Sequence, residues 1–286
     1  MPLNIATGVY MAQTLDLNYR TLTKPIRDKH VNDIINSVES SKITPYDSEL
    51  NWAERIGPIR TIRKKFAAWS ATWVSGLDAF PYMYVMNGNT EYIHSIFCLA
   101  QNPFAWKRDD YRYYSEWHKA AGKPYIELDE PGEVDDLLVT WPGYYLGDRR
   151  ELDFAEKCSV KRKHLDCAYL GVVKPMHLDV SDFETASFSF TKPLAIPYNR
   201  AALLFSKQII PSIELLNKIG YVNLGAVHLA SHIMDRLPIN YWWDKYGVAM
   251  QQLCKNNNLT PTSSLLSAFD GSDRIGLAQY WKDYNV

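Results

Sequence analysis

The most reactive pattern in the sequence is a lysine with a serine three residues before it and an arginine eight residues after it: Ser189, Lys192 and Arg200. The lysine lies in the mostly apolar segment 187–194, where an unpaired ammonium group is costly. Desolvation favours the neutral amine, which is the form that attacks an aldehyde to give a Schiff base. The alternative is an exposed lysine in a surface loop.

Other polar residues follow predicted strands, where the loops of an open α/β sheet carry reactive groups. Gly88, Asn89 and Thr90 stand between a strand and a helix, so the backbone N–H groups there are suited to a phosphate. Asp166 ends another strand, and Tyr169 follows it closely. Each feature alone also has a structural explanation, as a helix N-cap or a turn carboxylate.

These residues need a scaffold, and short apolar runs alternate with helical patterns through the middle of the chain. We predict strands over 82–86, 124–128, 137–140, 164–167, 186–190, 201–205 and 274–277, and helices over 30–41, 59–74, 90–99, 152–157, 213–219, 225–237 and 242–255. Such alternation is typical of βαβ units. The predicted fold class is therefore α/β, with a mostly parallel sheet flanked by helices.

Composition excludes several classes of protein. The 286 residues carry 31 Lys and Arg against 32 Asp and Glu, so the chain lacks the basic excess of a nucleic-acid or membrane-surface binder. No apolar run approaches the roughly 18 residues of a membrane span, and residues 1–16 do not resemble a signal peptide. We therefore expect a cytoplasmic protein. Its four cysteines lack metal or redox spacing, which favours reduced thiols.

Taken together, the reactive residues resemble the fold type I pyridoxal-phosphate enzymes, the aspartate aminotransferase superfamily. The resemblance covers roughly residues 80–205 and a short patch near 274. Ser189, Lys192 and Arg200 match the S-x-x-K segment and its downstream arginine. The resemblance implies that Lys192 forms a Schiff base with pyridoxal 5′-phosphate, while Ser189 and Arg200 hold the phosphate.

Asp166-Cys167-Ala168-Tyr169 is similar to the family's D-x-A-Y sequence at the end of a core strand. The resemblance implies that Asp166 pairs with the pyridine nitrogen and that Tyr169 bonds the phenolic oxygen of the ring. A carboxylate beside that nitrogen favours the pyridinium form, which withdraws electrons from the substrate. These two residues and Lys192 are the predicted catalytic set.

Three further segments extend the resemblance. Gly88, Asn89 and Thr90 are similar to the glycine turn that cradles the phosphate at a helix start. Tyr111 corresponds to the tyrosine that stacks on the cofactor ring, although a core aromatic is a serious alternative. Arg274 resembles the arginine that clamps the substrate carboxylate, a task that suits its planar guanidinium, with a surface ion pair as the alternative.

The chain departs from the family pattern in one motif and in its length. Where the family has N-P-x-x-P-x-G, this chain has the segment 141–147, and the asparagine position falls on Tyr144, which becomes a predicted cofactor contact. We predict an N-terminal arm over 1–50, a cofactor-binding domain over 51–210 and a reduced small lobe over 211–286. The resemblance also implies a homodimer with the sites at its interface.

The sequence thus predicts an aminotransferase that moves an amino group between an amino acid and a 2-oxo acid. A decarboxylase, lyase or racemase of the same fold is the nearest alternative, and a non-catalytic cofactor-binding relic is another. His177 and Asp179, with His228 or His232, have the residue types of a non-haem iron site. The βα alternation argues against the barrel of such oxygenases, so we predict no metal.

Overall fold

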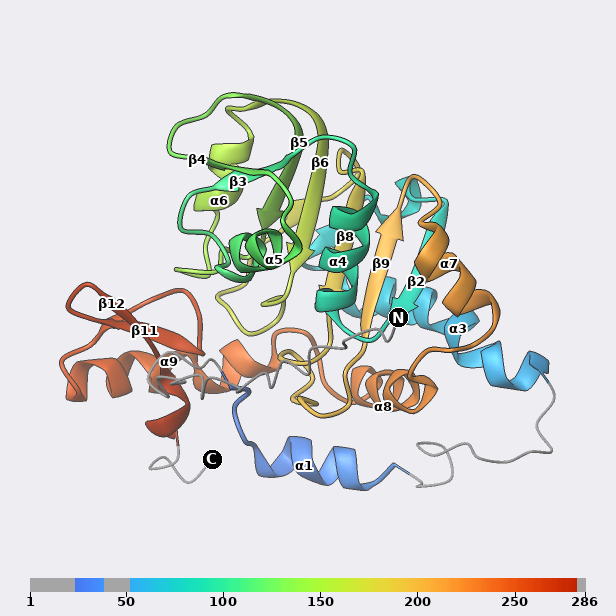
Figure 1. Cartoon of the computed structure of the whole chain (residues 1–286). Helices are drawn as coiled ribbons and strands as arrows, with labels where there is room; N and C mark the ends of the chain where they lie inside the picture. Colours follow the sequence, from blue (N-terminus) through green and yellow to red (C-terminus); the bar gives the residue numbers. More distant parts are fainter. Residues whose placement is uncertain (1–23, 39–51, 282–286) are drawn as a thin grey trace, which may run out of the picture.

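The computed structural model describes residues 24–38 and 52–281, in which a seven-stranded sheet forms the centre (Figure 1). Its strands lie in the spatial order β2 (Tyr82–Met86), β9 (Ala202–Ser206), β8 (Thr185–Ser189), β6 (Ser159–Cys167), β5 (Glu133–Thr140), β3 (Phe104–Lys107) and β4 (Tyr125–Leu128). Strand β9 runs antiparallel to both of its neighbours, and the other strands run parallel to one another. The predicted mostly parallel α/β sheet is confirmed.

Helices and two small sheets surround the central sheet. The helices are α1 (Lys29–Asn36), α3 (Trp52–Ser70), α4 (Asn89–Leu99), α5 (Tyr113–Ala121), α6 (Arg150–Ala155), α7 (Pro211–Lys218), α8 (Leu224–Met234) and α9 (Tyr241–Asn256), with short 3₁₀ helices at Leu77–Ala79 and Leu277–Gln279. The small sheets are β1 (Val74–Ser75) with β7 (Leu178–Asp179), and β10 (Thr260–Pro261), β11 (Ser267–Asp270) and β12 (Asp273–Gly276). None of the described helices has the length and apolar character needed to cross a membrane.

The two faces of the sheet are buried by different helices. Successive strand residues point to opposite faces, so Tyr84 and Met86 join one apolar cluster while Val85 joins the other. The first cluster includes side chains of α4, α5 and α7, and the second includes side chains of α3, α6 and α8. Helices therefore cover both faces, and the result is a three-layer α/β architecture.

Strand register brings the predicted site residues to one edge of the sheet. Asp166 in β6 lies beside Thr140 of β5 and Ser187 of β8. The first residue of β9, Ala202, lies between Ser189 and Met86, the last residues of its two neighbours. The chain segments that follow β2, β6 and β8 and the segment that precedes β9 therefore meet at this edge, as expected for an open α/β sheet.

Most predicted elements are present with boundaries shifted by a few residues, but β3, α5 and the short strands β1, β7, β10 and β11 were not predicted. The Phe104–Lys107 run is too short for periodicity to distinguish from a loop. Helix α1 ends at Asn36, so residues 37 and 38 of its predicted range are not helical, and 39–41 lie outside the described residues, as does most of the predicted arm. The division into three parts remains a prediction.

Candidate active site

Asp166 is the buried centre of the candidate site, with 1% of its surface exposed. Its two oxygens accept hydrogen bonds from Asn89 Nδ2 at 2.5 Å and from the Tyr114 hydroxyl at 2.9 Å. Burial raises the pKa of Asp166, while these two hydrogen bonds and the charge of Lys192 favour its ionised form. The carboxyl group is therefore held in place by neutral donors and is suited to a further cationic or N–H partner.

The two donors are themselves oriented by buried hydroxyl groups. Ser187 Oγ donates to Asn89 Oδ1 at 2.8 Å, which directs the amide nitrogen toward Asp166. The Tyr114 hydroxyl lies 2.8 Å from Thr140 Oγ1 and donates its own proton to Asp166. Each partner comes from a different element, so only the assembled sheet and helices create this arrangement.

Gly88, Thr90 and Arg200 form a second group at the start of α4. Gly88 is the N-cap and has a φ of 104°, a conformation that L side chains rarely adopt. A Cβ atom at this position would lie 3.1 Å from the Arg200 guanidinium, which in turn donates to Thr90 Oγ1 at 2.8 Å. A guanidinium beside the free N–H groups of a helix start is a favourable environment for an anion.

Ser189 and Lys192 follow at the end of β8. Ser189 Oγ accepts the backbone N–H of Thr191 at 3.3 Å, which opens the turn that carries the lysine. Lys192 is half-buried, and its Nζ lies 3.9 Å from the centre of the Tyr169 ring. The structure therefore places the amine of the predicted lysine over the ring of the predicted tyrosine. The charge of Lys192 also acts on Asp166 and favours its ionised form.

Three tyrosine rings line the approach to this lysine. The Tyr144 ring centre lies 5.1 Å from that of Tyr111 and 6.1 Å from that of Tyr169. Tyr111 also meets Tyr114 edge to face at 5.4 Å. Burial raises the pKa of Tyr111 and of Tyr144, so both phenols stay protonated at neutral pH. The segment that departs from the family motif therefore places Tyr144 beside Tyr111 and Tyr169.

Arg274 in β12 reaches the same tyrosines from the C-terminal part of the chain. Its guanidinium carbon lies 4.3 Å from the centre of the Tyr144 ring, and its Nε donates to the Tyr145 carbonyl at 3.3 Å. Its Nη2 is buried without a hydrogen-bond partner among the described residues. A buried guanidinium N–H without an acceptor is suited to receive a carboxylate.

A cavity of about 620 Å³ adjoins the site. Tyr111, Tyr144 and Arg274 contribute to its wall, whereas Asp166 and Lys192 do not line it. The remaining wall comes from the connection between β3 and α5 and from the β11–β12 hairpin. The cavity therefore adjoins two of the tyrosines and Arg274 but not the lysine, and charged residues form much of its wall.

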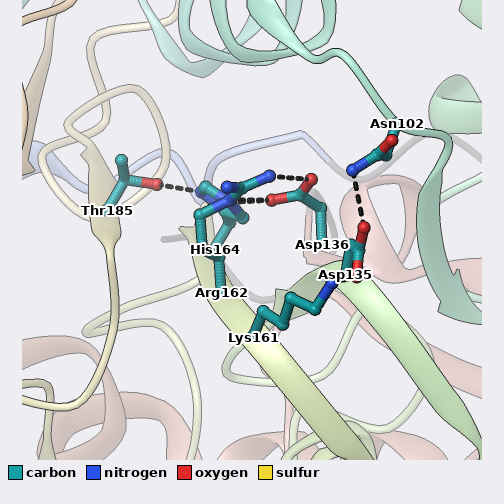
Figure 2. Close-up of polar contacts among 7 residues, drawn as sticks. All are labelled: Asn102, Asp135, Asp136, Lys161, Arg162, His164 and Thr185. Carbon is teal, nitrogen blue, oxygen red and sulfur yellow. Dashed lines mark hydrogen bonds and ion pairs between the residues drawn. The ribbon is translucent and has the colours of Figure 1, made fainter.

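A polar cluster also lies at the opposite, amino-terminal edge of the sheet, and Figure 2 shows its members: Asn102, Asp135, Asp136, Lys161, Arg162, His164 and Thr185. Asp136 accepts two hydrogen bonds from Arg162, at 2.5 and 2.6 Å, and lies 3.2 Å from His164 Nε2. His164 Nδ1 lies 2.9 Å from the Thr185 hydroxyl. The charge of Asp136 is thus matched inside the protein.

The histidines considered for iron do not form a ligand set. Asp179 accepts the backbone N–H of Ser181 at 2.9 Å, and His232 Nε2 lies 2.9 Å from the Ser37 hydroxyl. Within residues 24–38 and 52–281, no group of three His, Cys, Asp or Glu side chains could hold a metal ion. The open sheet also differs from the barrel that this alternative requires.

Sequence reasoning missed the residues that position Asp166. Tyr114 was not identified because α5 was not predicted, although Tyr111 and Tyr114 stand one helical turn apart in sequence. Asn89 is predicted to belong to the phosphate cradle through its backbone, and its side chain has the further role of bonding Asp166. The contact joins residues 77 positions apart in sequence, so no local sequence pattern predicts it.

Comparison with solved structures finds the same fold at very low sequence identity. A pyridoxal-phosphate-bound C-S lyase from Staphylococcus hominis is 10% identical, with a TM-score of 0.63 over 93% of this chain and 77% of that one. Histidinol-phosphate aminotransferase from Sinorhizobium meliloti is 12% identical, with a TM-score of 0.58 over 88% and 73%. L-Threonine-O-3-phosphate decarboxylase from Porphyromonas gingivalis is 15% identical, with a TM-score of 0.56 over 86% and 79%.

No protein-family model and no curated protein sequence matches the chain. The structural similarity therefore establishes the architecture: the chain has the fold of the fold type I pyridoxal-phosphate enzymes. These three neighbours are named for three different reactions, so the fold alone does not choose among them.

Proposed function

We propose that the protein is a pyridoxal-phosphate-dependent aminotransferase that moves an amino group between an amino acid and a 2-oxo acid. The observation that carries the proposal is the meeting of Lys192, Tyr169 and Asp166 at the carboxyl edge of the sheet. A transaminase of this fold needs an amine, a carboxylate for the pyridine nitrogen and a donor for the ring oxygen. These three residues have the required chemistry.

The residues around this edge fit the cofactor. Gly88 leaves open the space that a Cβ would fill beside Arg200, so a phosphate is able to approach the start of α4. Arg200, Thr90 and Ser189 would hold this phosphate. Asp166, whose hydrogen bonds come only from neutral donors in the described part of the chain, would bind the protonated pyridine nitrogen. Tyr111 would stack on the ring.

The chain's own residues then divide the work of the reaction. When bound, pyridoxal phosphate supplies an electron-poor ring that accepts the negative charge left at the substrate α-carbon. The Lys192 amine would take the α-proton as a base and deliver a proton as an acid. Tyr169, held 3.9 Å from the Lys192 Nζ, would orient that amine and favour its cationic form in turn. Arg274 would hold the substrate carboxylate.

Borohydride labelling tests the proposal most directly. Purified protein is incubated with pyridoxal phosphate, reduced, and digested, and the labelled peptide is mapped by mass spectrometry. We expect the label on Lys192. The substitution Lys192→Ala should remove the label and lower transamination by about 10²-fold or more, because the acid–base group is lost. Lys157→Ala, which removes an exposed lysine in the turn after α6, is the matched control.

The products distinguish transamination from the other reactions of this fold. One structural neighbour is a C-S lyase and another a decarboxylase, so both reactions are the alternatives to measure. Amino acids are supplied with a 2-oxo acid, and keto acid, amino acid and CO₂ are quantified. Formation of a new amino acid from the added keto acid supports transamination. A labelled protein that releases only CO₂, or forms no product, would require a different assignment.

The proposal includes a homodimer, because enzymes that this chain resembles build their sites between two subunits. Sedimentation of the purified protein at several concentrations measures the assembly state. A stable monomer with full activity would show that one chain completes the site alone.

A further inference from the structure

The cavity beside the candidate site carries more acidic than basic side chains. Its charged lining residues are Arg108, Asp109, Asp110, Arg112, Glu127, Asp270, Asp273 and Arg274. A ligand in this space meets charges from two separate parts of the chain, the β3–α5 connection and the β11–β12 hairpin. The partners of each charge decide which ligand the cavity suits.

Two of the three arginines are already matched by carboxylates. Arg108 donates to both oxygens of Asp129 and lies 3.7 Å from Glu127. Arg112 lies 2.8 Å from Glu116. Asp129 and Glu116 are not among the residues of the cavity wall, so of the acidic side chains that line the cavity only Glu127 is engaged by these two arginines.

Three exposed carboxylates of the lining form no ion pair in the described part of the chain, although Asp129, helped by the charge of Asp109, raises the pKa of Arg108. These carboxylates are Asp109, Asp270 and Asp273. Asp270 and Asp273 stand directly opposite each other across the β11–β12 ladder. Like charges at opposed positions destabilise a hairpin, so this pair weakens the fold unless a cation lies nearby.

Asp110 adds an independent, buried acceptor in the wall of the same cavity. Its side chain is 6% exposed, and its Oδ1 accepts the backbone N–H of Tyr111 at 2.7 Å. Its Oδ2 is buried without a hydrogen bond of good geometry in the described part of the chain, and the nearby Thr140 hydroxyl favours the ionised form. Burial and the nearby Glu151 charge raise the pKa of Asp110 to about 7. An unfilled acceptor of this kind is costly, and a donor group from a ligand would satisfy it.

The arrangement suits an organic cation better than a metal ion. No three acidic, histidine or cysteine side chains of the described residues stand close enough together to hold a metal. A longer ligand with separated charges fits the spread of carboxylates. At the other end, Arg274 Nη2 is buried and lacks an acceptor, which suits a carboxylate.

We infer that the substrate is an amino acid with a cationic side chain, whose carboxylate binds Arg274 and whose side-chain cation lies among Asp109, Asp270 and Asp273. The inference rests on the proposed function, because it identifies the adjoining cavity as the substrate site. It does not depend on which reaction follows, since charge recognition in the cavity precedes any chemistry. A substrate with an acidic side chain would meet the unpaired carboxylates and be repelled.

Titration calorimetry with L-lysine and L-norleucine tests the inference, because norleucine has the same carbon chain without the side-chain ammonium. The full chain is titrated with each ligand, both with and without pyridoxal phosphate. We expect lysine to bind about fivefold to tenfold more tightly than norleucine, as for one or two partly exposed ion pairs. Raising the ionic strength should weaken lysine binding and leave norleucine binding almost unchanged.

The double substitution Asp270→Asn and Asp273→Asn should remove most of the lysine preference and leave the norleucine affinity intact. Asp244→Asn, which neutralises an exposed carboxylate at the start of α9, is the control and should change neither affinity. The double substitution also removes the repulsion across the hairpin, so a higher melting temperature in ligand-free protein shows that the variant is folded.

Equal affinity for the two ligands, or a lysine preference that survives the double substitution, overturns the inference. Failure of the proposed function has a different signature, namely no borohydride label on Lys192. If the label forms and lysine is not preferred, the function stands and only the substrate class is wrong. If no label forms but lysine binds through Asp270 and Asp273, the cavity recognises cations in a protein that is not a transaminase.

Discussion

Two aspartates on neighbouring strands, Asp136 in β5 and Asp166 in β6, are almost equally buried but have opposite surroundings. Asp136 lies beside Arg162 in the strand register, and Asp166 lies beside Thr140, four residues along each strand. Arg162 and His164 hold the pKa of Asp136 at about 2 despite its burial. Asp166 has neutral hydrogen-bond donors, and burial raises its pKa.

If the proposed function holds, this difference separates a structural edge of the sheet from a functional one. At the amino edge the charge of Asp136 is matched within the chain, so removal of either partner would leave a charge without its counterpart (Figure 2). At the carboxyl edge the carboxylate of Asp166 is held in place but not neutralised by a bonded cation. Perturbed groups whose partner is missing cluster at functional sites, and here the missing partner fits a protonated ring nitrogen.

The largest effect expected from the comparison of Asp136 with Asp166 is a loss of turnover when Asp166 is substituted. Asp166→Asn should lower kcat by about a hundredfold or more, because an amide cannot stabilise the positive charge on the pyridine nitrogen. The free energy of unfolding should not fall, since the folded protein disfavours the charged carboxylate that is removed. Steady-state kinetics and urea unfolding measure the two quantities. An active variant would show that Asp166 is not the ring partner.

The matched substitution at the other edge should have the reverse effect. Asp136→Asn should lower the free energy of unfolding by about 2 kcal/mol, because it leaves the Arg162 charge without its buried partner. Arg162 is 41% exposed, which limits the loss. Turnover of the folded protein should stay within about twofold of the original. Asp135→Asn removes an exposed partner of Lys161 and should cost less than about 0.5 kcal/mol.

The contributions of the two aspartates to the free energy of unfolding should change in opposite directions with pH. The folded-state pKa of Asp136 lies below its usual 3.8, so its contribution to stability is complete above about pH 5 and is lost as the pH falls toward 2. The difference in unfolding free energy between the original protein and Asp136→Asn should therefore shrink by about 2 kcal/mol over that range. For Asp166 the raised pKa predicts the opposite slope, so Asp166→Asn should gain its advantage as the pH rises.

The smallest effect concerns the residue that positions Asp166. Tyr114→Phe removes one donor from the Asp166 carboxylate, so the pKa of Asp166 should rise further and kcat should fall by about tenfold or less. The acid limb of the pH–rate profile should move to higher pH. A purely structural role for Tyr114 would lower stability without moving that limb. Tyr113→Phe, which removes another hydroxyl of α5, one that contacts His94 of α4, is the control.

The sequence by itself predicted the local parts of this molecule. Strand β2 was predicted with its observed bounds, and the segments around Asp166 and Lys192 were placed at strand ends. Such features depend on neighbours within a few residues, and hydrophobic periodicity and motif spacing report those neighbours directly. The aromatic segment containing Tyr113 and Trp117 gave no clear helical signal, because such residues have modest helix propensity, and α5 was missed.

Tertiary structure decided how each local part is used. The contacts of Asp166 with Asn89 and Tyr114 join residues 77 and 52 positions apart, and the pairing of Asp136 with Arg162 depends on the register of two strands. The cavity likewise combines a loop near residue 109 with a hairpin near residue 272. Asp136 and Asp166 carry the same carboxyl group. Whether it stabilises the fold or awaits a ligand depends on which distant residues the packed chain brings to it, because burial and partner charge set its energy.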